Sequence, residues 1–218
     1  MFTKKRAFDL LSSILIISVI TPFVIFAYPL LIWLIGKPII FKQLRTGKNG
    51  RPFIMYKLRS MKKNAQESKK RYIGENEAPA PMFKIFNDPR FIKKEIKLPG
   101  SKKTTVLAVG QFLSKSGLDE VPQLLNILKG EMSLIGPRPL PVNEAEAIKR
   151  TDPSWYKWRH SVNPGIFSAW AADPEHNLSL KHWKKLEKET IEMSALEKIS
   201  IVFKIIFKQI SNILKERR

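Results

Sequence analysis

An uncharged run from Leu10 to Gly36 constrains the fold of this chain more than any other feature. A straight helix over this run reaches about 40 Å at a rise of 1.5 Å per residue. The hydrocarbon core of a bilayer is about 30 Å thick. The run is therefore long enough to enter a membrane, and we expect two parts: a membrane-embedded segment, residues 1–36, and a second domain, residues 37–218.

Two features of the run favour a re-entrant hairpin over a single crossing. Pro22 lies near its middle, where a proline removes a backbone donor and bends or breaks a helix, and Thr21 can bond back to a carbonyl there. Both flanks are basic, with Lys4–Arg6 before the run and Lys37, Lys42 and Arg45 after it. The positive-inside rule would keep both flanks on the cytoplasmic side. A single crossing stays open as the alternative.

The charge of the chain is strongly basic and unevenly spread. The 218 residues carry a formal net charge of +20, and residues 1–66 hold twelve Lys or Arg against one acid, Asp9. A basic block beside an apolar run favours anionic lipid headgroups and phosphorylated substrates. Nucleic acid is the usual rival partner for such charge, and we rank it last because of the apolar run. The chain has no cysteine, so no disulfide framework exists.

Residues 117–139, GLDEVPQLLNILKGEMSLIGPRP, carry the chemistry. Asp119 and Glu120 open an apolar stretch that is predicted to be helical through Leu128, with Gly130 at its end. We expect the helix start to favour the ionised form of Asp119. Arg138 follows between two prolines that fix its backbone. Carboxylates and a cation in one unit bind a metal and phosphates, and a carboxylate attacks phosphorus. The plain alternative is helix capping.

Residues 37–63 are predicted to form strand, turn and strand, with the turn at the glycines of 46–50. Alternation along 53–59 places Lys57 and Arg59 on one face, as a phosphate clamp requires. A solvated basic edge is the alternative reading. Residues 87–105 are predicted to be an exposed excursion that turns at Pro99-Gly100.

The C-terminal third is predicted to be helical. Residues 143–160 read as one or two helices with Glu144 on the exposed side, and their tryptophans suit either a membrane interface or a core. The tail from Leu196 is apolar at helical spacing and basic between those positions, which is typical of a helix lying in the headgroup plane. Packing on the domain is the alternative. The predicted fold class is α+β, mostly helical, with a re-entrant membrane hairpin, a small mixed catalytic domain and in-plane amphipathic helices.

Several blocks, in order, resemble the bacterial sugar transferase family, the small monotopic phosphoglycosyl transferases. The blocks are KRAFD with the proline-broken apolar run, FKQLRTG at 41–47, YKLRSM at 56–61, LDEVPQLLN at 118–126 and KGEMSLIGPRP at 129–139.

The resemblance implies an enzyme that moves a sugar-1-phosphate from a UDP-sugar to a polyprenyl phosphate, such as undecaprenyl phosphate, and releases UMP. It places the protein at the cytoplasmic face of the bacterial inner membrane, among its lipids, and requires Mg²⁺. Asp119 would be the nucleophile, forming a covalent phosphosugar intermediate, and Glu120 would hold the metal. The substrate and phosphate ligands would be Arg138, Lys57, Arg59, Arg45 and Gln43. A homodimer is compatible with the sequence, which does not fix the oligomeric state.

The chain also departs from the family pattern. Asn163 stands where members usually have arginine, Asp173-Pro174-Glu175 replaces the usual Asn-Gly-Arg, and Ser114 replaces a basic residue. Residues 91–106 resemble an insertion. These differences motivate an alternative, a membrane-bound member that has lost activity and serves assembly or binding.

Overall fold

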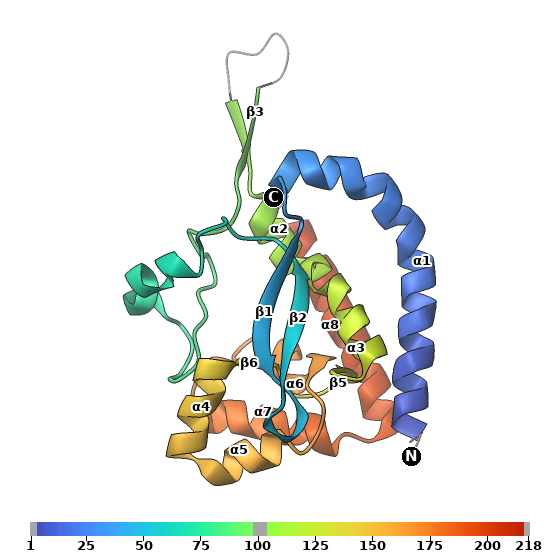
Figure 1. Ribbon diagram of the computed structural model, residues 1–218, viewed down its shortest axis with the longest axis vertical. Coiled ribbons are helices and arrows are strands. Elements are labelled where there is room, and N and C mark those ends of the chain that lie inside the picture. The colour runs from blue at the N-terminus through green and yellow to red at the C-terminus, as the bar shows by residue number, and fades with distance from the viewer. Residues whose placement is uncertain (1–3, 98–103, 216–218) are drawn as a thin grey trace.

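The computed structural model describes residues 4–97 and 104–215. Helix α1 (Lys4–Ile35) runs along one side of a mixed body of short strands and helices (Figure 1). Within the described part of the chain, α1 is the one helix long and apolar enough to cross a membrane. Most of its large apolar side chains are exposed, which a water-soluble surface rarely tolerates over so large an area.

Helix α1 is continuous and bent rather than broken into two helices. Figure 1 shows that it curves over between its two ends, and it contains Pro22 and Pro29. A proline inside a helix is a known cause of such bending. As predicted, Thr21 bonds back to the preceding turn, with its Oγ1 donating to the Ile17 carbonyl at 2.7 Å. The re-entrant path through a membrane stays a prediction.

Both ends of α1 are docked on the rest of the protein. Near the start, Asp9 accepts hydrogen bonds from the Ser133 hydroxyl and the Leu134 amide, at 2.9–3.0 Å. At the other end, Ile35 is buried in a small core with Ile92 and Leu113. One body therefore holds both helix ends.

A three-stranded antiparallel sheet, in the order β2-β1-β6, forms one wall of the body. Strands β1 (Ile40–Thr46) and β2 (Pro52–Leu58) are joined by the single turn η1 (Lys48–Gly50), which confirms the predicted strand, turn and strand. Strand β6 (Leu140–Pro141) pairs with Arg45 and Thr46. This pairing brings the segment after Arg138 to the end of β1.

The central motif begins as a 3₁₀ helix rather than an α-helix. Segment η3 (Leu118–Gln123) contains Asp119, and α3 (Leu124–Lys129) follows and ends at Gly130, which has a φ of 81°. Gly117, with a φ of 72°, starts the unit in place of an Asp119 cap. The predicted helix end is confirmed. The predicted start is confirmed as well, since Asp119 and Glu120 lie in the first turn of a helical segment, which winds more tightly than an α-helix around Pro122.

Two glycines allow the next crossing. Strand β5 (Ser133–Ile135) pairs in parallel with β7 (Gly165–Phe167). A Cβ on Gly165 would lie 2.0 Å from the Gly136 nitrogen, and one on Gly136 would lie 2.4 Å from the Asn163 carbonyl. Only glycine fits at these two positions, so the segment that leads to Arg138 sits directly on the loop before β7.

The C-terminal helices pack around tryptophan. They are α4 (Val142–Thr151), α5 (Pro153–Arg159), α6 (Ala169–Ala172) and α7 (Leu180–Glu192). Trp155, Trp170 and Trp183 are buried in one cluster. Trp155 and Trp170 therefore belong to the hydrophobic core and not to a membrane interface. The expectation that Glu144 is exposed is wrong: it is 5% exposed and pairs with Lys69 at 3.2 Å, because a long lysine folds over that face of α4.

The remaining elements lie around this core. Segment η2 (Glu67–Glu75) is a 3₁₀ stretch, and α2 (Val109–Lys115) leads into the central motif. Strands β3 (Lys94–Lys97) and β4 (Thr104–Leu107) form a hairpin that projects from the body (Figure 1), which confirms the predicted excursion there. The predicted exposure of its first part is wrong: Asp88, Arg90, Phe91 and Ile92 are buried, since Asp88 and Arg90 pair with each other and the two apolar side chains join the core. The predicted turn at Pro99-Gly100 lies outside the described residues.

The last helix, α8 (Ala195–Lys215), turns the predicted apolar stripe away from the protein. Leu196, Ile199, Phe203, Ile206 and Ile210 are between 40% and 80% exposed. A different face of α8, with Ile205 at its centre, packs on the body. The helix is confirmed, whereas a position in the headgroup plane stays a prediction.

Candidate functional site

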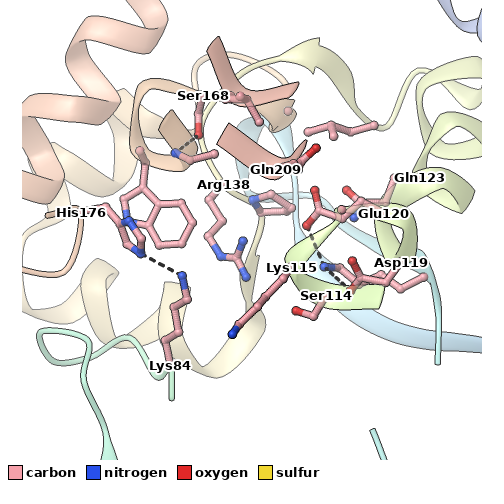
Figure 2. Close-up of a pocket in the computed structure, with 18 of the residues that line it drawn as sticks. Lys84, Ser114, Lys115, Asp119, Glu120, Gln123, Arg138, Ser168, His176 and Gln209 are labelled. Carbon is pink, nitrogen blue, oxygen red and sulfur yellow. Dashed lines mark hydrogen bonds and ion pairs between the residues drawn. The ribbon is translucent and has the colours of Figure 1, made fainter. Parts of the chain in front are cut away.

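A cavity of about 220 Å³ opens between the central motif, the β1–β2 sheet, the segment between η2 and β3, and α6 with α8. Figure 2 shows the side chains that point into it. The residues that matter most for its chemistry are Lys57, Lys84, Asp119, Glu120, Arg138 and Trp170.

The predicted carboxylate pair lies on one side of this cavity. Lys57 Nζ donates to Glu120 Oε1 at 2.8 Å and lies 3.6 Å from Asp119 Oδ2. Asp119 is 5% exposed. Asn126 fixes the motif on the sheet: its Oδ1 accepts from the Tyr56 amide at 3.1 Å, and its Nδ2 donates to the Ile54 carbonyl at 2.7 Å. The strand that carries Lys57 and the helix that follows Asp119 thus form one rigid unit.

The two carboxyl groups have different pKa shifts. Burial, reinforced by the neighbouring charge of Glu120, raises the pKa of Asp119 to about 6 against the opposing effect of Lys57. Burial also acts to raise the pKa of Glu120, but Lys57 and Arg138 outweigh it and hold the pKa below its usual value. The expectation that a helix start keeps the Asp119 pKa low is therefore wrong, since burial dominates. Asp119 is still mainly ionised at neutral pH.

Arg138 occupies the middle of the cavity. In Figure 2 its guanidinium lies between the carboxylates and a second group of residues at Lys84 and His176. It stacks over the Trp170 ring at 4.8 Å. Its backbone carbonyl accepts a hydrogen bond from Arg159 at 2.8 Å, and Arg159 is itself paired with buried Glu187 at 2.7 Å. Arg159 and Glu187 thus fix the backbone of the turn on the side away from the cavity. Arg138 faces the same cavity as the two carboxyl groups, as predicted.

Arg45 and Gln43 lie beside this group. Arg45 donates to the Pro139 carbonyl at 2.8 Å and to the side chain of Gln43. Burial and the nearby charge of Arg138 lower the pKa of Arg45 to about 9. Arg45 lines the cavity, so it adds positive charge there, whereas Gln43 orients Arg45 from an adjoining pocket.

Arg59 is turned toward the end of α1. Its guanidinium donates to the carbonyls of Pro38 at 2.8 Å and Gly36 at 3.0 Å, and to that of Ile35. The predicted shared strand face with Lys57 is not found, because β2 ends at Leu58; Arg59 lines an adjoining pocket with Lys57, and its contacts close the end of the helix. A contact with phosphate stays a prediction.

Sequence reasoning missed three cavity residues: Lys84, His176 and Lys208. Lys84 lies between η2 and β3 and Lys208 lies on α8, and no local sequence pattern sets either residue apart. His176 carries no sequence signal either, because the three histidines of the chain, His160, His176 and His182, lack metal-ligand spacing. It follows the segment that departs from the family pattern, and with Trp170 it makes that segment a wall of the cavity.

The carboxylate pair fits a magnesium ion only with help from a substrate. Among the described residues, no group of three or more His, Cys, Asp or Glu is placed to hold a metal. Mg²⁺ is commonly bound by one or two carboxylates together with substrate phosphates. Glu120 is the better ligand of the two, because its pKa is lowered and its charge is kept. In the free site, the ammonium group of Lys57 is the cation that pairs with Glu120.

A helix that is long and apolar enough to cross a membrane is docked on a body that carries two carboxyl groups beside cations. The chain matches the family model described as bacterial sugar transferase over residues 1–216. It belongs to that family, which confirms the resemblance.

The relatives include transferases that act on undecaprenyl phosphate. The galactosyl transferase CpsE of Streptococcus agalactiae is 39% identical over 66% of this chain and 28% of its own length. The undecaprenyl-phosphate galactose phosphotransferase of Salmonella typhimurium is 38% identical over 76% of the chain and 32% of its own.

The UDP-glucose:undecaprenyl-phosphate glucose-1-phosphate transferase of Escherichia coli is 33% identical over 95% of the chain and 40% of its own length. The chain thus spans well under half of each of these three relatives.

Proposed function

We propose that this protein transfers a sugar-1-phosphate from a UDP-sugar to a polyprenyl phosphate and releases UMP. The observation that carries the proposal is the cavity in which Asp119 and Glu120 face Lys57 and Arg138. Membership of the sugar transferase family and the activities named for its relatives support it, since two of them act on undecaprenyl phosphate and one on UDP-glucose.

In the first half-reaction, Asp119 is the nucleophile. A carboxylate oxygen attacks the phosphorus that bears the sugar, and the bond from this phosphorus to the oxygen of the nucleotide breaks. UMP leaves with the electron pair, and the sugar phosphate stays on Asp119 as an acyl phosphate. Burial strips water from the attacking carboxylate, and Lys57 holds it in place.

In the second half-reaction, an oxygen of the polyprenyl phosphate attacks the same phosphorus. The bond to Asp119 breaks, the carboxylate is regenerated and the lipid diphosphate sugar leaves. Arg138 and Arg45 stabilise the negative charge on the phosphoryl oxygens in both steps. Two half-reactions on one enzyme group should give ping-pong kinetics.

Mg²⁺ held by Glu120 and by the substrate phosphates would neutralise the diphosphate and its leaving oxygen. In the free site, Lys57 pairs with the Glu120 carboxylate and favours its ionised form.

The enzyme would work at the cytoplasmic face of the bacterial inner membrane. Both ends of α1 are docked on one body, so a re-entrant path that returns both ends to the same side is the simplest placement. The exposed apolar stripe of α8 would lie in the headgroup region of the same leaflet. The basic flanks of α1 favour the cytoplasmic side.

A UMP-release assay tests this function. Detergent-solubilised protein is mixed with Mg²⁺, undecaprenyl phosphate and each of a panel of UDP-sugars. We expect UMP with at least one donor, and a phosphosugar mass on a peptide that contains Asp119 when the acceptor is omitted. Asp119→Asn should abolish both signals. Turnover by the Asp119→Asn variant would refute the covalent mechanism, and no turnover with any donor would favour the inactive assembly role.

A further inference from the structure

The cavity has a second charged side that the carboxylates do not neutralise. It consists of Lys84, Arg138 and Lys208, which we call the cationic wall. Among the described residues, none of the three has a carboxylate within ion-pair distance. Lys208 donates to the carbonyls of Ala171 and Asp173, at 3.1 and 3.3 Å, and Arg138 lies over the Trp170 ring. Three such cations around one cavity favour a polyanionic ligand.

His176 fixes the position of Lys84. The Lys84 Nζ lies 2.8 Å from His176 Nε2, and His176 Nδ1 lies 2.6 Å from the Asp173 carbonyl. Burial, with the adjacent charge of Lys84, lowers the pKa of His176 to about 4. The ring is therefore neutral at pH 7: its Nδ1–H donates to the carbonyl, and Nε2 accepts from Lys84. This assigns His176 as a positioning residue.

The cationic wall is electrostatically unfavourable without a ligand. Burial and repulsion from Arg138 and Lys208 lower the pKa of Lys84 to about 7. Glu120, across the cavity, acts in the opposite direction on Lys84. An anion bound against the cationic wall would offset the repulsion among its three side chains, since each cation would gain a charged hydrogen bond.

The position of the wall matches the geometry of phosphoryl transfer. The attacking and leaving oxygens lie roughly in line on opposite sides of the transferred phosphorus. Asp119 and Arg138 both face the cavity, and Figure 2 places Arg138 between the carboxylates and Lys84. A phosphorus held by Arg138 and attacked from Asp119 therefore directs its leaving group toward Lys84.

We propose that Lys84, positioned by His176 and assisted by Arg138 and Lys208, is the subsite for the phosphate monoester of the nucleotide that leaves. This inference rests on the proposed function and deepens it. In the second half-reaction, the phosphate of the lipid acceptor approaches from the same side. The shared chemistry is a phosphate monoester dianion, so the two sources are tested separately.

The test measures UMP binding to the full-length protein in detergent by calorimetry. Lys84→Met should weaken UMP binding by about 10- to 100-fold, the range of one lost charged hydrogen bond. Lys84→Arg keeps the charge and should bind UMP within a few-fold of the parent. The control is Lys185→Gln, because the Lys185 side chain on α7 is 70% exposed and should not matter. UMP affinity unchanged in Lys84→Met would overturn the proposal.

His176 is tested by two variants. His176→Phe keeps a ring against Trp170, 4.3 Å away between centroids, but removes the acceptor for Lys84. UMP affinity should fall in this variant and recover in His176→Gln, whose side-chain oxygen can accept. If both variants fold, by thermal unfolding, and bind UMP equally well, the positioning role is refuted.

The design separates this inference from the proposed function. If no UDP-sugar is turned over but UMP binding depends on Lys84, the transferase proposal fails and the subsite stands. If UMP is released from a donor but UMP binding is indifferent to Lys84, the subsite fails and the function stands. A parallel titration with undecaprenyl phosphate distinguishes the two sources of the phosphate. If Lys84→Met weakens the binding of undecaprenyl phosphate but not that of UMP, the assignment to the nucleotide is refuted.

Discussion

At the scale of single residues, burial sets the chemistry of Asp119. The carboxyl is 5% exposed, and its pKa lies near 6 because desolvation outweighs the pull of Lys57. A less hydrated carboxylate is a stronger nucleophile, and it is also a cost to the fold. Lys57 moderates both effects because it touches Asp119 and Glu120 together.

The pH dependence of turnover follows from this pKa. Protonation removes the nucleophile, so kcat/KM for UMP release should fall about tenfold per pH unit below a midpoint near 6. Lys57→Met removes the charge that lowers the pKa of Asp119, and the midpoint should move to higher pH. The rate is measured from pH 5 to 8 at fixed Mg²⁺, with Lys185→Met as the control. An identical acidic limb in Lys57→Met would contradict the assignment.

Asp119 should also reduce stability. Its folded pKa of about 6 lies above the ordinary value of 3.8, so the folded state binds this proton more tightly than the unfolded state. The ionised group therefore destabilises the fold above about pH 6, and the effect vanishes below about pH 4. Asp119→Asn should raise the free energy of unfolding by about 1–3 kcal/mol at pH 8 and little at pH 4. A difference independent of pH would be contrary to this account.

At the scale of elements, buried polar contacts from α5 and α7 fix the backbone of the turn that carries Arg138. Glu187 on α7 accepts from Arg159, Trp155 and Trp183, and Arg159 holds the carbonyl of Arg138. Loss of Glu187 would leave the indole N–H groups of Trp155 and Trp183 without this acceptor and the buried Arg159 without a counter-charge. Helix α7 therefore supports a turn whose own sequence gives no hint of that support.

Removal of Glu187 should be costly. Glu187→Ala leaves Arg159 as an unpaired buried charge, and we expect a loss of about 3–5 kcal/mol in the free energy of unfolding. Glu189→Ala, two residues further along α7, removes only an exposed pair of 3.9 Å with Lys185 and should cost less than about 1 kcal/mol. Denaturant unfolding in detergent compares the two, and equal losses would show that the buried pair is not the cause.

The crossing of β5 and β7 gives a second prediction at this scale. Gly165→Ala places a methyl group 2.0 Å from the Gly136 nitrogen, so the two strands must move apart and Arg138 must shift with them. UMP release should fall by at least about tenfold, since a displacement of about 1 Å in a catalytic group is this costly. Gly74→Ala is the matched control, because nothing lies within 4 Å of its added carbon. Full activity in Gly165→Ala would refute the argument.

At the scale of the whole molecule, the two ends of the apolar helix belong to one body. Arg59 binds the carbonyls at the end of α1, and Asp9 binds Ser133 and Leu134 at its start. The exposed apolar side chains lie between these anchors and along α8. The proposed membrane placement would cover these side chains from one side of the protein.

The topology can be tested with single cysteines, because the chain has none. Lys5→Cys and Lys37→Cys lie at the two ends of α1 and are exposed. A membrane-impermeant thiol reagent should label both from the cytoplasmic side of inverted vesicles and neither from the outer side of intact spheroplasts. Phe26→Cys, on a residue that is 85% exposed within α1, should resist the reagent from both sides. Labelling of the two ends from opposite sides would establish a single crossing.

What the sequence alone determined is local. An uncharged run, a turn with two glycines, alternation along 53–59 and the Asp119-Glu120 pair before an apolar stretch are read from neighbours in the chain, and they gave the long helix, the β1–β2 hairpin and the carboxylates. Only the tertiary structure decided what depends on distant neighbours: the raised pKa of Asp119, the turn of Arg59 toward α1, the burial of Glu144 and the meeting of Lys84 with His176. Desolvation and pairing of charges are set by groups brought together by folding, 92 residues apart for that last pair, and no local pattern records them.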